Sequence, residues 1–133
     1  MKNLLPILIA ALLLVGCAAP SQQEGGYRQI TMEEAVAMME KESDYIILDV
    51  RTPAEFHEKH IPGAINIPNE TIGTDTIPEL PDKDQLIMVY CRSGNRSKQA
   101  SEKLHQLGYT NVVEFGGIID WPGETQTNEG GPQ

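Results

Sequence analysis

The chain has 133 residues, which is enough for one domain of ordinary size. Hydrophobic residues make up 40% of it and charged residues 22%, as is typical of a globular protein. Nineteen acidic residues against ten basic ones give a formal net charge of −9, and no basic stripe appears, so nucleic-acid binding is not expected.

The first sixteen residues have the pattern of a lipoprotein signal peptide. Lys2 precedes an apolar stretch from Leu4 to Val15, which is too short to span a bilayer comfortably. The sequence LVGC that ends at Cys17 resembles the lipobox of bacterial lipoproteins, and the alternative is an ordinary secretory signal. The resemblance implies cleavage before Cys17 and a lipid, such as palmitate, on that residue. Several acyl chains there would anchor an exported protein to a bilayer in the cell envelope, on the outer face of the cytoplasmic membrane or the periplasmic side of a membrane.

The remaining chain divides into a tether, one domain and a tail. Residues 17–26 are polar and read as a lipidated tether, residues 27–123 carry the helix and strand signals, and residues 124–133 form a polar tail that we expect to be disordered. If Cys17 is lipidated, Cys91 is the only thiol left. A single leftover cysteine in an exported domain is a candidate reactive thiol.

Strand and helix signals alternate through residues 27–123. Thr31 and Glu34 form a capping-box pattern at the start of a helix, and Thr52 with Pro53 opens a second one. The apolar runs predict strands at 45–50, 64–67, 85–90 and 111–115, a third helix at about 97–107, and a turn or short helix around Trp121. This alternation predicts a single α/β domain with a central parallel sheet flanked by helices.

The loop CRSGNRS at residues 91–97 joins a central strand to the third helix. Ligands of open α/β sheets bind at this edge, and the loop amides and the helix start favour negative charge. Such a site lowers the pKa of a cysteine from its usual value of about 8.5. Gly94 permits the turn, while Arg92 and Arg96 add positive charge. Each of these residues is common in ordinary loops, but together beside Cys91 they favour a thiolate that binds anions.

Three segments carry a family resemblance: LDVRTPAEFHEKHIPGAINIP, YCRSGNRS and VVEFGGIIDWPG resemble the single-domain rhodanese homology family. The match covers nearly all of residues 27–123. It implies that Cys91 takes a sulfane sulfur from a small anion such as thiosulfate and passes it from a persulfide to cyanide or a thiol, without a metal or organic cofactor. The residues implied in binding the donor and the persulfide are Arg92, Ser93, Gly94, Asn95, Arg96 and Ser97.

The resemblance also implies a scaffold around this loop. Asp49 and Arg51 match a strand-end motif that ties strand to loop, and His60 is expected to have a hydrogen-bonded structural role. His57 lies three residues before His60, but no cluster of cysteines or carboxylates completes a metal site, so none is expected.

Two other classes of function stay open. One is a non-catalytic module that carries sulfur or binds a partner, which the sequence does not identify. The other is a phosphatase or arsenate reductase, but such enzymes place five residues between cysteine and arginine, whereas four separate Cys91 from Arg96. Two departures from the family pattern affect the site: Lys59 stands where glycine is usual, and the segment after Trp121 is short.

Overall fold

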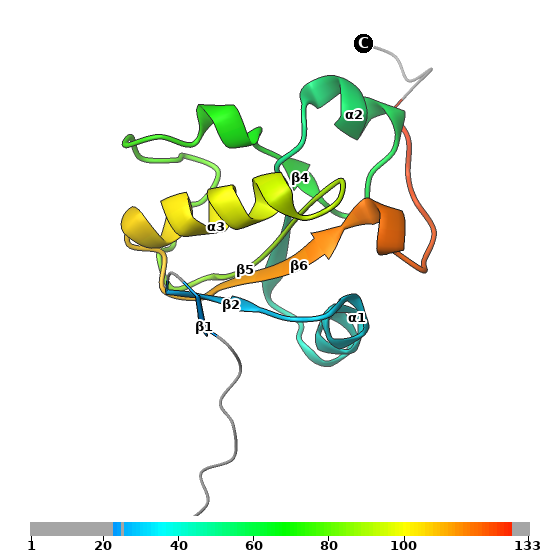
Figure 1. Ribbon diagram of the computed structural model, residues 1–133, viewed down its shortest axis with the longest axis horizontal. Coiled ribbons are helices and arrows are strands. Elements are labelled where there is room, and N and C mark those ends of the chain that lie inside the picture. Colours follow the sequence, from blue (N-terminus) through cyan, green and yellow to red (C-terminus); the bar gives the residue numbers. More distant parts are fainter. Residues whose placement is uncertain (1–22, 25, 129–133) are drawn as a thin grey trace, which may run out of the picture.

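The computed structural model describes residues 23–24 and 26–128 (Figure 1). The expected signal peptide, Cys17 and most of the expected tether lie outside these residues. Within the described part of the chain, no helix has the length and apolar character needed to cross a bilayer.

A six-stranded sheet forms the centre of the domain, in the order β1-β2-β6-β5-β3-β4. All neighbouring strands from β2 to β4 across the sheet run parallel, and β1 pairs antiparallel with β2. The strands are β1 (Gln23–Glu24), β2 (Tyr27–Gln29), β3 (Tyr45–Asp49), β4 (Ile65–Asn66), β5 (Leu86–Cys91) and β6 (Val112–Gly117). The predicted α/β fold with a central parallel sheet is therefore confirmed. The expected tether differs at its end, because Gln23 and Glu24 form the edge strand β1.

Helices cover both faces of this sheet, with α1 on one side and α3 on the other (Figure 1). The helical segments are α1 (Met32–Lys41), α2 (Pro53–Glu58), α3 (Asn95–Gln106) and the single 3₁₀ turns η1 (Asn69–Thr71) and η2 (Ile118–Asp120). Both predicted helix starts are confirmed: Thr31 and Thr52 each complete a capping box with the glutamate three residues later. The third helix begins two residues earlier than predicted, because Gly94 takes a left-handed φ of 116° and caps it.

Side chains of β5 alternate between the two faces. Val89 and Cys91 pack on the α3 side with Leu48 and Leu104, while Met88 and Tyr90 pack on the α1 side. Both β5 and its neighbour β3 are buried on both faces, which explains their almost continuous apolar sequences. The alternation fixes which elements surround Cys91, since only the α3 side of the sheet faces its sulfur.

Residues 124–128 differ from the expected disordered tail. They run beside α2, where Gln126 and His60 exchange two backbone hydrogen bonds of 2.8 and 2.9 Å. The amide of Asn128 donates to the carbonyl of His57 at 3.0 Å. The end of the short helix α2 leaves backbone groups without helical partners, and this segment pairs with them. The polar sequence gave no sign of these contacts because only backbone atoms of residues 126 and 128 make them.

Candidate active site

Cys91 is the last residue of β5 and lies at the carboxyl edge of the sheet. Arg92, Ser93 and Gly94 form the whole connection to α3, so only three residues separate the strand from the helix. The thiol is free, and the residue is 1% exposed. The short connection brings the start of a twelve-residue helix close to the sulfur atom, with its unpaired amides and the positive end of its dipole.

Two groups contact the sulfur directly. The amide of Gly94 donates to Sγ of Cys91 at 3.0 Å, and the Ser97 hydroxyl oxygen lies 3.4 Å from Sγ. The amide donor stabilises negative charge on the sulfur, and the hydroxyl group can either accept the thiol proton or donate to a thiolate. This arrangement supports nucleophilic chemistry at Cys91.

A buried carboxylate lies behind the hydroxyl of Ser97. Oε2 of Glu114, on β6, is 2.7 Å from Oγ of Ser97 and accepts the amide of Gly116 at 2.6 Å. Glu114 is only 3% exposed. Glu114 falls inside the strand predicted at residues 111–115, where it has no predicted role. The signal that could have identified Glu114 as a functional residue is its acidic side chain within an otherwise apolar strand.

The end of β6 contains a bulge and lies close to the loop that follows Cys91. Between the pairs Val89–Glu114 and Cys91–Gly117 the strand β6 contains one residue more than β5, which makes a bulge at Gly116. Gly117 lies so close to the loop that a Cβ atom there would collide with backbone atoms of Arg92 and Ser93. The Gly116-Gly117 pair therefore sets both the carboxylate contact and the position of the loop.

The two arginines of the loop have different surroundings. Arg96 makes a two-pronged ion pair with Glu55 of α2, with N–O distances of 2.6 and 3.1 Å. The hydrogen bond from Arg96 lowers the pKa of Glu55 to about 2, and the same contact raises the pKa of Arg96. Arg92 is exposed, and its side chain forms no hydrogen bond or ion pair with the described residues. The expectation that both arginines face a donor fits the exposed Arg92, whereas Arg96 is held by α2. No signal in the sequence links Arg96 to Glu55, which lies forty-one positions earlier.

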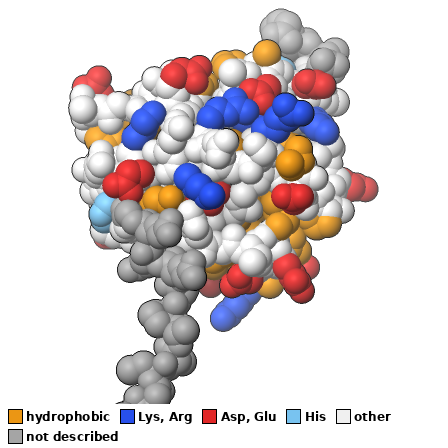
Figure 2. Space-filling view, in the orientation of Figure 1, with side chains coloured by type: hydrophobic (Ala, Val, Ile, Leu, Met, Phe, Trp, Pro, Cys, Tyr) orange, Lys and Arg blue, Asp and Glu red, His pale blue; other side chains and the backbone are white. Residues whose placement is uncertain are grey.

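The other predicted loop residues line the rim and the wall of this site. Ser93 and Asn95 are exposed, while Gly94 and Ser97 are buried. Lys and Arg side chains lie across the upper part of the molecular face that Figure 2 shows, with Asp and Glu side chains between and beside them.

Asp49 and Arg51 form a buried network on the α1 side of the sheet, away from Cys91. The Asp49 carboxylate accepts bonds from the Arg51 guanidinium at 2.7 Å and from the hydroxyl of Tyr90 at 2.7 Å. Burial and the neighbouring Asp49 raise the pKa of Tyr90, so its hydroxyl keeps its proton. The Arg51 guanidinium also donates to the Lys59 carbonyl at 2.6 Å. These bonds tie the end of β3 to the segment that follows α2, as the scaffold role of Asp49 and Arg51 requires.

His60 lies in this scaffold too. Its ring stacks on Phe56 with centroids 3.9 Å apart, and Nδ1 is 2.8 Å from the Phe56 carbonyl. Lys59, at the usual glycine position, has an extended backbone with φ of −166°, which any residue can adopt. Its departure from the family pattern therefore leaves the backbone undisturbed.

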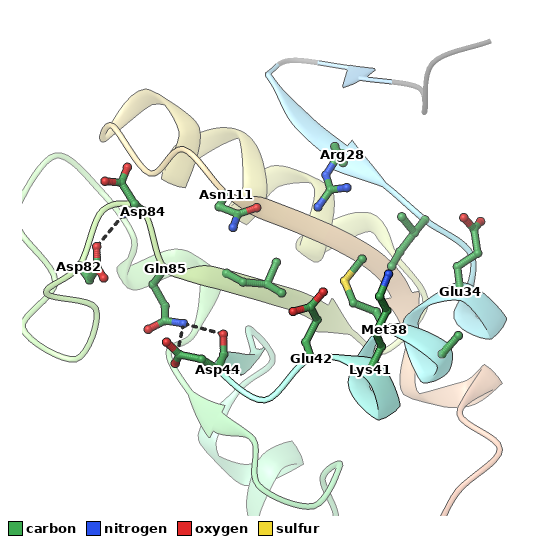
Figure 3. A pocket seen from close by; sticks show the side chains of 13 residues that line it. Arg28, Glu34, Met38, Lys41, Glu42, Asp44, Asp82, Asp84, Gln85 and Asn111 are labelled. Carbon is green, nitrogen blue, oxygen red and sulfur yellow. Dashed lines mark hydrogen bonds between the residues drawn. The ribbon is translucent and has the colours of Figure 1, made fainter. Parts of the chain in front are cut away.

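A hollow of about 700 Å³ lies at the opposite edge of the sheet from Cys91 (Figure 3). Its walls include Asp44 and Gln85, which precede β3 and β5, and Glu42 and Lys41 at the end of α1. Gln85 already bonds Asp44 there. Among residues 23–24 and 26–128, no group of three or more His, Cys, Asp or Glu side chains is arranged to hold a metal ion.

The chain resembles known proteins in both sequence and fold. A family model described as the rhodanese-like domain matches residues 31–123. The chain is 41% identical over 73 residues to the thiosulfate sulfurtransferase PspE of Escherichia coli (strain K12), a match that covers 55% of this chain and 70% of that protein. It is 39% identical over 94 residues to a sulfurtransferase of Allochromatium vinosum, covering 70% of this chain and 86% of the relative.

A solved structure shows the same fold. The structure described as a rhodanese with anions from E. coli superposes with a TM-score of 0.57 and 36% sequence identity. The superposition covers 62% of this chain and 98% of that protein.

Proposed function

Because the chain belongs to the rhodanese-like domain family, we propose that it is a sulfurtransferase in which Cys91 carries sulfur from a thiosulfate-type donor to a thiophilic acceptor. The observation that carries this proposal is the buried free thiol at the end of β5, with the Gly94 amide 3.0 Å from its sulfur. The name of the E. coli relative, a thiosulfate sulfurtransferase, supports thiosulfate as the donor.

The reaction divides into two displacements on sulfur. The Cys91 thiolate attacks the outer sulfur of thiosulfate, so a new S–S bond forms and sulfite leaves with the electron pair of the old one. Cyanide or a thiol then attacks the outer sulfur of the persulfide, and Cys91 departs as a thiolate. The Gly94 amide stabilises negative charge on the cysteine sulfur in both steps. The exposed Arg92 is suited to attract the anionic donor, since its guanidinium is not engaged elsewhere in the described chain.

The site gives less support to a phosphatase. The loop has one residue fewer between cysteine and arginine than phosphatases use, and Arg96 is already paired with Glu55. Asp49, the acidic residue of the strand-end motif, is bound by Arg51 and Tyr90 on the other side of the sheet. It is therefore poorly placed to protonate a leaving group at Cys91.

The test uses the full chain carrying Cys17→Ser, in which Cys91 is the only thiol. Incubation with thiosulfate should add the mass of one sulfur atom to the protein, and cyanide should then remove it as thiocyanate. A Cys91→Ser variant with an unchanged melting temperature should do neither. Persulfide formation without turnover to cyanide or any thiol would favour a sulfur carrier. Hydrolysis of an aryl phosphate that depends on Cys91, without persulfide formation, would overturn the proposal in favour of a phosphatase.

We further propose that the protein is exported and anchored by a lipid on Cys17. This proposal rests on the lipobox-like sequence LVGC and the apolar run before it. The native chain should partition into the detergent phase and carry a lipid mass on its N-terminal peptide, while a Cys17→Ser variant should lose both properties. Recovery of the unmodified wild-type chain in an aqueous fraction would contradict it.

A further inference from the structure

A buried carboxylate, a hydroxyl and the thiol form one hydrogen-bonded line in this site. We propose that Glu114 is a positioning residue that takes the thiol proton of Cys91 through Ser97 and so generates the thiolate. The inference rests on the proposed function and adds to it the destination of the proton. Sγ of Cys91 is 3.4 Å from Oγ of Ser97, and that oxygen is 2.7 Å from Oε2 of Glu114.

The direction of the bonds follows from the single proton of the Ser97 hydroxyl. Three acceptors lie within its reach: the Glu114 carboxylate at 2.7 Å, the Gly94 carbonyl at 2.9 Å and the Gly116 carbonyl at 3.4 Å. The charged and closest acceptor forms the strongest hydrogen bond. A hydroxyl group that donates to Glu114 presents a lone pair to its other neighbours, and this lone pair accepts the thiol proton of Cys91.

Burial makes the presence of Glu114 hard to explain by packing alone. A carboxylate that is 3% exposed in a central strand is costly unless donors surround it. The bulge at Gly116 supplies one such donor, the amide that lies 2.6 Å from Oε2. An apolar residue at position 114 would need neither the bulge nor the buried charge. The strand is thus built to hold a carboxylate beside Ser97.

The other charged groups near β6 do not compete for this proton. On the side of the sheet that Glu114 faces, β5 contributes Cys91, β2 contributes Tyr27, and α3 contributes Arg96, which is paired with Glu55.

The charged groups farther from Glu114 have other surroundings. On α3, Lys98 and His105 are exposed, Glu102 accepts a bond from Gln106, and Lys103 donates to Asn69. Arg28 of β2 lines the hollow at the opposite edge of the sheet, and α1 with its charges packs on the other side. Tyr90 of β5 also points to that side, where it donates to Asp49.

The proton transfer balances without any oxidant or cofactor. The S–H bond of Cys91 breaks as the proton joins Oγ of Ser97, and the original hydroxyl proton moves to the Glu114 carboxylate. The products are a thiolate, an intact serine and a neutral carboxylic acid. The Ser97 hydroxyl now donates to the thiolate, so the same two side chains stabilise the nucleophile that they produce. The second displacement releases Cys91 as a thiolate and therefore needs no base.

The test uses the fact that only the first displacement needs a base to form the thiolate. In the full chain carrying Cys17→Ser, Glu114→Gln keeps the shape of the side chain and removes its ability to take a proton. Persulfide formation from thiosulfate in a single turnover, and alkylation of Cys91 by iodoacetamide, should both slow by about 10²-fold at pH 7. The deficit should shrink at high pH, because hydroxide from the solvent can then remove the thiol proton without Glu114. Removal of sulfur from a preformed persulfide by cyanide should keep its wild-type rate.

Controls separate this role from a structural one. Ser97→Ala interrupts the same line and should reproduce the altered pH profile, and the double variant should be no slower than either single one. Glu70→Gln removes one charge at an exposed position and should change nothing. Equal slowing of both displacements, or alkylation of Glu114→Gln at or above the wild-type rate, would overturn the proposal. Alkylation needs no sulfur donor, so this result is distinguishable from a failure of the proposed function, in which the wild type forms no persulfide.

Discussion

Gly117 provides a sharp test of how β6 positions the reactive loop. A methyl group at this position would meet the carbonyl group of Arg92 and the amide nitrogen of Ser93 at well under 3.0 Å. Both neighbours are backbone atoms, so no side-chain rotation relieves the collision. Overpacking of this kind costs about 1–3 kcal/mol. Each kcal/mol lowers the melting temperature of a domain of this size by about 4–8 °C.

The same collision displaces the loop that carries the Gly94 amide. A shift of about 1 Å in a reacting group can lower a rate by about 10²-fold. Gly117→Ala should therefore lose about that much single-turnover persulfide formation, in addition to its loss of stability in a thermal melt. Gly73→Ala is the matched control, because its Cβ meets no atom within 4 Å and its φ is unremarkable for an L-residue. If Gly117→Ala melted and reacted like Gly73→Ala, the close approach of β6 to the loop would not position Cys91.

Two further predictions concern the charged contacts. Glu55→Gln should lower the free energy of unfolding by about 0.2–1 kcal/mol at pH 7, because the ion pair with Arg96 is partly exposed. The folded-state pKa of about 2 lies below the ordinary 4.5, so this contribution is present above pH 4.5 and disappears as the pH falls toward 2. Urea titrations from pH 7 to 2 should show the two proteins converging, whereas exposed Glu58→Gln should track the wild type throughout. Asp49→Asn leaves the guanidinium of Arg51 buried without its counter-charge and should cost about 3–5 kcal/mol in the same titration. A cost below 1 kcal/mol, like that of exposed Asp120→Asn, would refute the scaffold role.

Local sequence signals predicted the framework well. The capping boxes at Thr31 and Thr52 and the apolar runs of β3 and β5 each depend on a few neighbouring residues, and the structure contains all of them. The position of Cys91 at a strand end followed from the same runs. The start of α3 was predicted two residues late because the left-handed turn at Gly94 appears in the sequence only as a glycine.

Contacts between distant segments were beyond such signals. Glu114 lies seventeen positions from Ser97, and Glu55 lies forty-one from Arg96. Each pair meets only because the sheet order places β6 beside β5, and the start of α3 near α2. Nothing in the sequence around Arg96 shows that its charge is already matched. Which loop residues remain free for a donor is therefore a property of the tertiary structure.

The pairing of residues 126 and 128 with α2 has a consequence for sequence variation. The amides of Gln126 and Asn128 donate to the carbonyls of His60 and His57, and the His60 amide donates to the Gln126 carbonyl. No side chain of residues 126 or 128 takes part in these bonds, so many residue types would serve at both positions. Proline would not, because it lacks the amide hydrogen that each position donates. Related chains could thus preserve this pairing while their C-terminal sequences drift apart, and an alignment would record only the exclusion of proline at two alternate positions.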